Sequence, residues 1–290
     1  MNLAIAIPLG LASAVAYGAA AAVQHHAVGQ DESESGAPAF GDLVHDPRWW
    51  ASIGGDVVGL VLQLAALATG PVVLVQPLFV LCLPIALPIR AMFGGAAPNR
   101  DDYLAALVLA LGLCGFFVIA GDAGYAHSLS TRTSALLAGV AMLAGAFIAV
   151  LAARLVAASR AVTLSAVSGV WFGVEAVLVN SLATSFAHHS WAAFGRAEGL
   201  VPLVGAAVVG ISGFALSQVA FRSGNLAASF PAMLVIDPLV AVLLGAALLR
   251  ESVRASPAAA VGYFLCLIAI SLATLRLARP ARADLAPRLA

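Results

Sequence analysis

Long apolar runs constrain this chain more than any other feature of its sequence. Of its 290 residues, 62% are hydrophobic and only 10% are charged. Soluble domains carry roughly 25% charged residues. A run of about 20 apolar residues is long enough to cross the hydrocarbon core of a bilayer as a helix. The sequence therefore predicts an all-α polytopic membrane protein, and its composition excludes soluble enzymes, nucleic-acid binders and disordered chains.

Nine apolar runs are predicted to be transmembrane helices in one membrane domain over residues 1–290. The first could be a signal peptide, but no Arg precedes it and it exceeds the usual length of about 7–15 apolar residues, so it is interpreted as a retained helix. The acidic segment 27–48 is expected to be a solvated linker rather than a binding segment, and 279–290 a disordered tail. The nine runs lie at Leu3–Gln24, Trp49–Thr69, Pro71–Phe93, Tyr103–Ala120, Thr133–Ala157, Thr163–Phe186, Leu200–Phe221, Leu226–Leu249 and Ala258–Leu277.

The distribution of Arg predicts the orientation, because cytoplasmic loops carry an excess of basic residues. With the N-terminus outside, ten Arg fall on the cytoplasmic side and four on the other, and four of those ten lie at or beyond Arg276. We therefore expect a protein of the cell (inner) membrane with its N-terminus outside and its C-terminus in the cytoplasm.

An internal repeat is visible in the spacing of Gly, Pro and Arg residues along the chain. The stretch Ala14–Gly18 matches Gly169–Gly173 at an offset of 155. Helices one to four (about 3–121) thus pair with six to nine (about 163–278), and a linking helix (about 133–157) lies between them. A displacement of five spans makes the copies upside down, an inverted repeat typical of secondary transporters. Four further pairs share an offset of 154: Gly70 and Gly224, Pro77 and Pro231, Pro84 and Pro238, Arg100 and Arg254.

Three acids fall inside apolar spans: Asp56, Glu175 and Asp237. A charged side chain at the centre of a bilayer costs on the order of 2.5–3.5 kcal/mol on insertion scales, so such residues commonly have a function. Glu175 is predicted to be protonated or to hold a cation in a central polar cavity; the alternative is a neutral packing residue. Asp237 precedes Pro238, which frees the Leu234 carbonyl. This predicts either an ion or substrate site at a broken helix or a locally satisfied kink.

Polar side chains on the predicted helices extend this set of candidates. Gln63 and Gln76 flank the Gly70-Pro71 turn and could line a pathway or act as interhelical glue. Asn180 and Thr184 share a helix face and are expected to form a polar stripe with Glu175. Asn225 completes the pathway candidates: Glu175, Asp237, Asp56, Gln76, Gln63, Asn180, Thr184 and Asn225.

Bound groups and helix ends are predicted as follows. If a metal binds, Glu175 and Asp237 are the residues expected to hold it, and no cofactor is expected. The three Cys residues are expected to pack as small apolar side chains. The Arg250-Glu251 pair that closes the eighth helix is expected at the surface.

The sequence contains no complete enzyme motif, so no enzyme activity is expected. Gly210–Gly213 matches the GxSG string of intramembrane serine proteases, but every His precedes Ser212, whereas those enzymes need a later His to activate the Ser. No phosphate-binding loop or dinucleotide fingerprint is present in the sequence, so this chain alone is not expected to use ATP.

Several short motifs resemble the drug/metabolite transporter superfamily, and most closely its nine-helix, NIPA-type magnesium-transporter branch. They are Gln24 with a His pair, Trp49-Trp50, Gly70-Pro71 before Val75–Leu78, Asn225–Ala228 with Pro231, and Pro238 followed by Leu243–Gly245 and Arg250–Ser252. The resemblance implies that Glu175 is the coupling carboxylate. The branch carries a Glu and an Asn in helix two where Leu60 and Gln63 stand here, and Asp56 lies one turn before Leu60.

The sequence as a whole predicts an EamA-like secondary transporter that moves a small solute or a divalent cation such as magnesium by alternating access. The alternative is a non-transporting membrane assembly or sensor subunit with the same fold. The expected partners are the solute, the lipid bilayer and a possible second copy in a homodimer, and nucleic acid is not expected.

Overall fold

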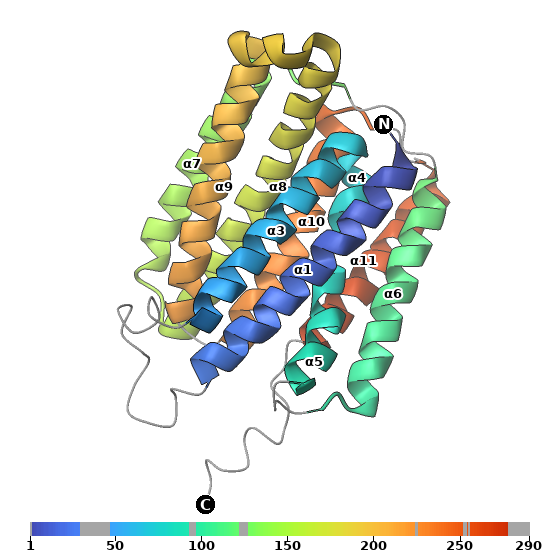
Figure 1. Cartoon of the computed structure of the whole chain (residues 1–290), viewed down its shortest axis with the longest axis vertical. Helices are drawn as coiled ribbons and strands as arrows, with labels where there is room; N and C mark the ends of the chain where they lie inside the picture. The colour runs from blue at the N-terminus through green and yellow to red at the C-terminus, as the bar shows by residue number, and fades with distance from the viewer. Residues whose placement is uncertain are drawn as a thin grey trace, which may run out of the picture.

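The computed structural model of the chain describes residues 2–29, 47–92, 97–121, 127–223, 226–251, 254 and 256–277. These residues form a bundle of helices without a strand (Figure 1). Eight helices are long and apolar enough to cross a membrane, and a ninth carries a shorter apolar stretch, Ala232–Leu248. The predicted all-helical, multi-pass membrane architecture is therefore confirmed, whereas the count of nine spans is supported in part.

The helices are α1 (Leu3–Gly29), α3 (Pro47–Thr69), α4 (Val72–Val75), α5 (Cys82–Met92), α6 (Arg100–Ala120), α7 (Thr131–Ala152), α8 (Ala157–His189), α9 (Ala197–Ser223), α10 (Leu226–Leu248) and α11 (Pro257–Leu277), with 3-10 turns η2 (Gln76–Leu81) and η3 (Ser190–Gly195). Three predicted boundaries are wrong. Helix α1 continues five residues past Gln24, α7 ends at Ala152 rather than Ala157, and α8 begins at Ala157 rather than Thr163. Hydropathy marks only the apolar part of a helix, which continues into the polar flank where the backbone hydrogen bonds allow.

The third predicted span is not a continuous helix. It consists of α4, the 3-10 segment η2 and α5 in succession, and η2 carries Pro77 in its first turn. Pro lacks an N–H and its ring clashes with the carbonyl four residues earlier, which favours such an interruption.

The break predicted beside Asp237 is absent, because α10 runs on through Pro238. A membrane helix can accommodate Pro where neighbouring groups satisfy the freed carbonyl.

The packing pairs of the two halves correspond. Helix α1 packs extensively on α3 and contacts η2 and α5, while α8 packs on α9 and α10. Helices α1 and α8 run in opposite directions along the bundle, and so do α3 and α9 (Figure 1). Helices α6 and α11 pack against each other.

A serine contact recurs in the two halves. Ser13 on α1 donates its hydroxyl to the Gly59 carbonyl on α3 at 2.8 Å. Ser168 on α8 donates in the same way to the Gly213 carbonyl on α9 at 2.7 Å. The two serines are 155 positions apart and the two glycines 154. The same interhelical hydrogen bond is therefore made twice, at the offset seen in the sequence.

A close glycine approach also recurs. A Cβ added at Gly18 would lie 2.6 Å from the Cys82 carbonyl oxygen, and one at Gly173 would lie 2.8 Å from the Asp237 carbonyl oxygen. Both pairs are 155 positions apart. Only glycine lets these backbones approach so closely, as is common between membrane helices. Cys82 and Asp237 thus each receive a glycine of a neighbouring helix, at the offset seen in the sequence.

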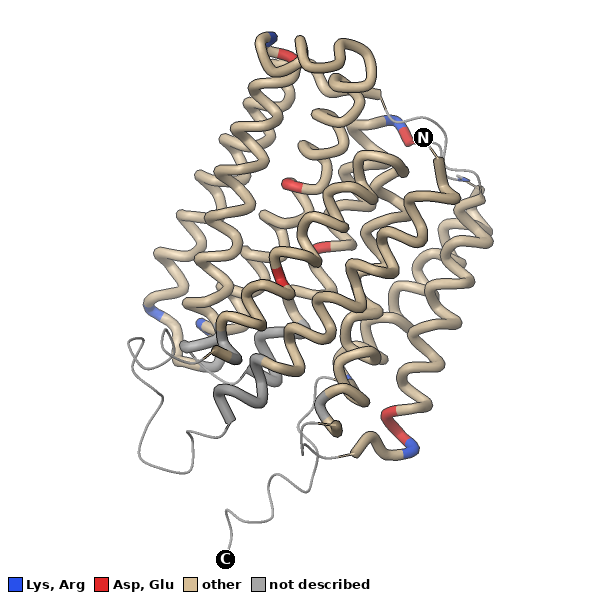
Figure 2. Tube along the Cα trace, viewed as in Figure 1, with Lys and Arg blue, Asp and Glu red and all other residues tan. Residues whose placement is uncertain are grey.

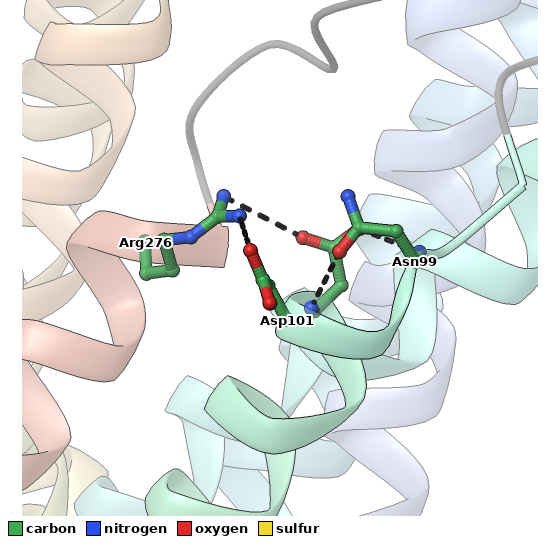
Figure 3. A network of polar contacts seen from close by, with 4 residues as sticks. Asn99, Asp101 and Arg276 are labelled. Atoms are coloured by element: carbon green, nitrogen blue, oxygen red, sulfur yellow. Dashed lines mark hydrogen bonds and ion pairs between the residues drawn. The ribbon is translucent and has the colours of Figure 1, made fainter.

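Charged residues gather at the ends of the bundle, with a few acidic positions in its middle (Figure 2). At one end, Arg276 on α11 forms an ion pair with Asp101 on α6 at 3.0 Å and approaches Asp102 to 3.7 Å. Asn99 and Asp102 form a capping box at the start of α6 (Figure 3). These contacts hold α6 and α11 together at the polar boundary of the bundle.

Candidate functional site

Three candidate residues form a hydrogen-bonded chain through the interior. Gln63 on α3 donates to Gln76 Oε1 at 2.8 Å, and the Gln76 amide donates to Asp237 Oδ1 on α10 at 2.8 Å. Gln76 and Asp237 are 1% and 3% exposed. We call these three residues the polar chain. It joins helices of the first half to a helix of the second, so the alternative of a locally satisfied Asp237 does not hold.

Two glycines of α8 bring Asp237 close to that helix. A Cβ at Gly169 would lie 2.8 Å from the Met233 carbonyl oxygen, and Gly173 meets the Asp237 carbonyl in the same way. These glycines are four residues apart, the spacing at which two small residues share one helix face. The sequence GVWFG of α8 therefore sets the distance between α8 and the polar chain.

Glu175 lies two residues after Gly173 on α8 and faces α9. A Cβ at Gly210 would lie 2.6 Å from Glu175 Cδ, so the absence of a side chain there makes room for the carboxylate. Glu175 is half-buried, and within the described part of the chain its carboxylate has no hydrogen bond or ion pair. An unpaired carboxylate inside a membrane protein is costly unless it takes a proton or a cation.

Asp56 and Tyr17 complete the interior group. Asp56 on α3 is half-buried and, like Glu175, has no hydrogen bond or ion pair in the described residues. The Tyr17 hydroxyl lies within electrostatic range of Asp56, Glu175 and Asp237. Its ring packs against Gly59 and contacts Phe79 edge-on, with centroids 5.0 Å apart. The three acids therefore act on one region around the Tyr17 phenol.

Asn180 and Thr184 do not extend this group as a polar stripe. The Asn180 amide donates to the carbonyls of Leu67 and Gly70 at 2.8 and 3.0 Å, and thereby holds the α3–α4 turn against α8. The Thr184 hydroxyl donates to the Asn180 carbonyl within its own helix. Asn180 Oδ1 is buried and has no partner among the described residues. Both residues thus satisfy backbone groups rather than line an open path.

Glu251 is a residue whose place the sequence misjudged. It was expected at the surface with Arg250, but it is 3% exposed, and its two carboxylate oxygens accept hydrogen bonds from the Val72 and Val73 N–H groups at 2.8 Å. Arg250 has a positive φ of 54°, which turns the chain back toward α4. The helix-end position of an acid was visible in the sequence, but the donors that bind it are 178 and 179 residues away.

The described residues contain a pocket of about 50 Å³ between η2, α6, α10 and α11, whose lining is largely apolar and excludes Glu175. The central cavity expected around Glu175 stays a prediction. No group of three or more His, Cys, Asp or Glu side chains that could hold a metal ion occurs among the described residues. Asn225 lies outside the described residues.

The chain is similar to a bacterial protein along almost its whole length. The chain is 28% identical over 287 residues to an uncharacterized protein of Corynebacterium glutamicum, and the match covers 95% of each chain. No family model matches the chain, and no solved structure matches it. The name of that relative assigns no activity, so a functional conclusion has to come from the interior residues themselves.

Proposed function

We propose that this protein is a secondary transporter of the drug/metabolite type that moves a small solute by alternating access. The observation that carries the proposal is the repetition of the same helix contacts, at offsets of 154 and 155, in halves whose matching helices run in opposite directions. Inverted repeats are the architecture that lets one half mirror the movement of the other about a site near the midplane.

The polar chain supports this proposal because it lies between the halves. Gln76 belongs to the 3-10 segment of the first half, and Asp237 belongs to α10 of the second. Mid-helix 3-10 stretches are often functional hinges. A hydrogen bond from such a segment to a buried acid is a contact that can exist in one state of the transporter and be lost in the other.

The interior acids favour a cationic solute or a coupling proton. Asp56, Glu175 and Asp237 act on one region, and Glu175 and Asp56 have no partner in the described residues. Mg²⁺ usually retains several of its waters in a protein site. Magnesium is a candidate solute only because of the family resemblance. The proposed solute class is a small cation or cationic metabolite.

Transport by the purified protein in liposomes tests the proposal. A panel of Mg²⁺, monovalent cations and small amines is offered with and without a proton gradient, and uptake is followed together with internal pH. We expect at least one solute to be taken up above the level of empty liposomes. Glu175→Gln keeps the size of the side chain, but the amide cannot alternate between a charged and a neutral form. The variant is therefore expected to lower gradient-driven uptake at least tenfold.

The matched control is Glu198→Gln, which makes the same change at an exposed acid in the first turn of α9 and is expected to leave uptake unchanged. Gly210→Ala displaces the Glu175 carboxylate without altering the acid, whereas Gly139→Ala adds a methyl group where nothing lies within 4 Å. No uptake of any solute by a folded protein would contradict the proposal and favour a non-transporting subunit.

A further inference from the structure

Each half of the molecule pairs one carboxylate with one small residue at matching positions. In the second half, Glu175 on α8 faces Gly210 on α9. Their counterparts in the first half are Ala20 on α1, 155 positions earlier, and Asp56 on α3, 154 positions earlier. A Cβ at Gly55, beside Asp56, would lie 3.0 Å from the Ala20 Cβ, so these helices are also in close contact at this point. By this count, the acid stands on α3 in the first half and on α8 in the second.

The matching register does not depend on the acids themselves. It is fixed by the serine hydrogen bonds of α1 and α8 and by the close glycine approaches one turn further along the same helices. These contacts involve backbone carbonyls, which hold the two helices in one register. The correspondence of Asp56 with Gly210, and of Ala20 with Glu175, then follows from counting along each helix.

Each of the two acids also lies within electrostatic range of one residue of the pair Cys82 and Asp237. Asp56 lies within electrostatic range of Cys82, and Glu175 lies within range of Asp237. Cys82 and Asp237 are themselves the matched pair whose carbonyls receive the glycines of α1 and α8. Asp237 is bound to Gln76, whereas Asp56 and Glu175 are half-buried and have no hydrogen bond or ion pair in the described residues. The two unbound acids are therefore the ones available to a ligand.

We propose that Asp56 and Glu175 are the two repeat-related members of one coupling device, and that each binds and releases the coupling proton or cation toward opposite sides of the membrane. This inference rests on the proposed function. In an inverted repeat, the movement that closes a position in one half opens its counterpart in the other. A carboxylate in each half then gives every conformation one acid that can exchange with water.

The first test is Asp56→Asn in the liposome assay, beside Glu175→Gln and the Glu198→Gln control. We expect Asp56→Asn to lower gradient-driven uptake at least tenfold, as Glu175→Gln does. Normal uptake by Asp56→Asn together with loss in Glu175→Gln would overturn this inference and leave the proposed function intact. Normal uptake by both variants would show that neither acid is needed for coupling. No uptake by the parent protein would contradict the proposed function.

The second test moves the acid to the other helix. The double variant Asp56→Gly, Ala20→Glu gives the first half the arrangement of the second, and it is expected to recover at least a third of the uptake that Asp56→Gly loses. Ala16→Glu in the same Asp56→Gly background places the acid one turn away on α1 and is expected to recover none. A folded double variant without recovery overturns the matching of positions; if it does not fold, the result of Asp56→Asn decides.

Discussion

At the scale of single residues, Gln76 carries the most connected side chain of the interior. Its carbonyl oxygen accepts from Gln63 and its amide donates to Asp237, so one side chain satisfies two partners on different helices. An amide is suited to this place because it is both donor and acceptor and remains neutral in a buried site. Gln76 therefore holds the Asp237 carboxyl from another element of the bundle.

Gln76→Ala is expected to destabilise the protein more than Gln63→Ala. The first change leaves both the Gln63 amide and the Asp237 carboxyl without their partner, and each buried unsatisfied polar group costs about 1–3 kcal/mol. The second change leaves one group, Gln76 Oε1, without its donor, and interhelical hydrogen bonds in membranes average about 0.6 kcal/mol. Thermal unfolding in detergent measures both variants. Equal losses would mean that the contact with Asp237 contributes nothing.

At the scale of elements, the junction of α4 with the end of α10 is the notable feature. Val72 and Val73 begin α4, where N–H groups have no partner within their own helix. Glu251 provides both acceptors from beyond α10, and Asn180 binds the carbonyls on the other side of the same turn. The short helix between Pro71 and the 3-10 segment is thus held by side chains of the second half.

The hydrogen bonds between Glu251 and the start of α4 predict that the stability of the protein depends on pH. Burial raises the pKa of the Glu251 carboxyl above its ordinary value of 4.5, while the hydrogen bonds from Val73 and Val72 oppose this shift. The folded protein then holds this proton more tightly than the unfolded chain does. The contribution of Glu251 to the free energy of unfolding is therefore full below pH 4.5 and falls as the pH rises through the folded pKa.

Glu251→Gln removes this titration and replaces one of the two acceptor oxygens by a donor. We expect the variant to melt at a lower temperature than the parent, and the difference between them to shrink as the pH rises above about 4.5. Melting curves of both proteins in detergent across pH 4–8 measure this difference. A difference that grows with pH would show that the two backbone hydrogen bonds outweigh burial. Glu198→Gln serves as the exposed control and is expected to show no such change.

At the scale of the whole molecule, the charges define the two membrane faces. Charged positions lie mainly at the ends of the bundle (Figure 2), and the Arg count assigns the cytoplasm to the face that carries Arg100, Arg154 and Arg276. The four Arg of the other side are Arg132, Arg196, Arg250 and Arg254. The orientation with a cytoplasmic C-terminus stays a prediction from this distribution of Arg.

Reporter fusions check this orientation. A fusion at Ala290 and an insertion within segment 27–48 are both expected to report the cytoplasm, because these segments flank spans that end on the Arg-rich face. A fusion after Arg196 is expected to report the outside. An outside signal from the fusion at Ala290 would reverse the assignment of the two faces, although it would leave the helix packing unchanged.

The sequence by itself determined the membrane class and the approximate places of the apolar helices, and it predicted an internal repeat at offsets of 154 and 155. Each of these depends on local composition or on spacing along the chain. It also singled out Asp56, Glu175 and Asp237, because an acid inside an apolar run is conspicuous without any knowledge of its neighbours. The turn at Gly70-Pro71 was predicted on the same local basis and lies between α3 and α4.

Only the tertiary structure decided which of these polar groups meet. Gln76 and Asp237 are 161 residues apart, and Val72 and Glu251 are 179 apart, so no local pattern could pair them. The sequence predicted a broken helix at Asp237-Pro238, whereas the structure has its interruption at Gln76-Pro77. Hydrogen bonds and close glycine contacts depend on distances of a few tenths of an ångström between helices, and those distances exist only once the halves have packed together.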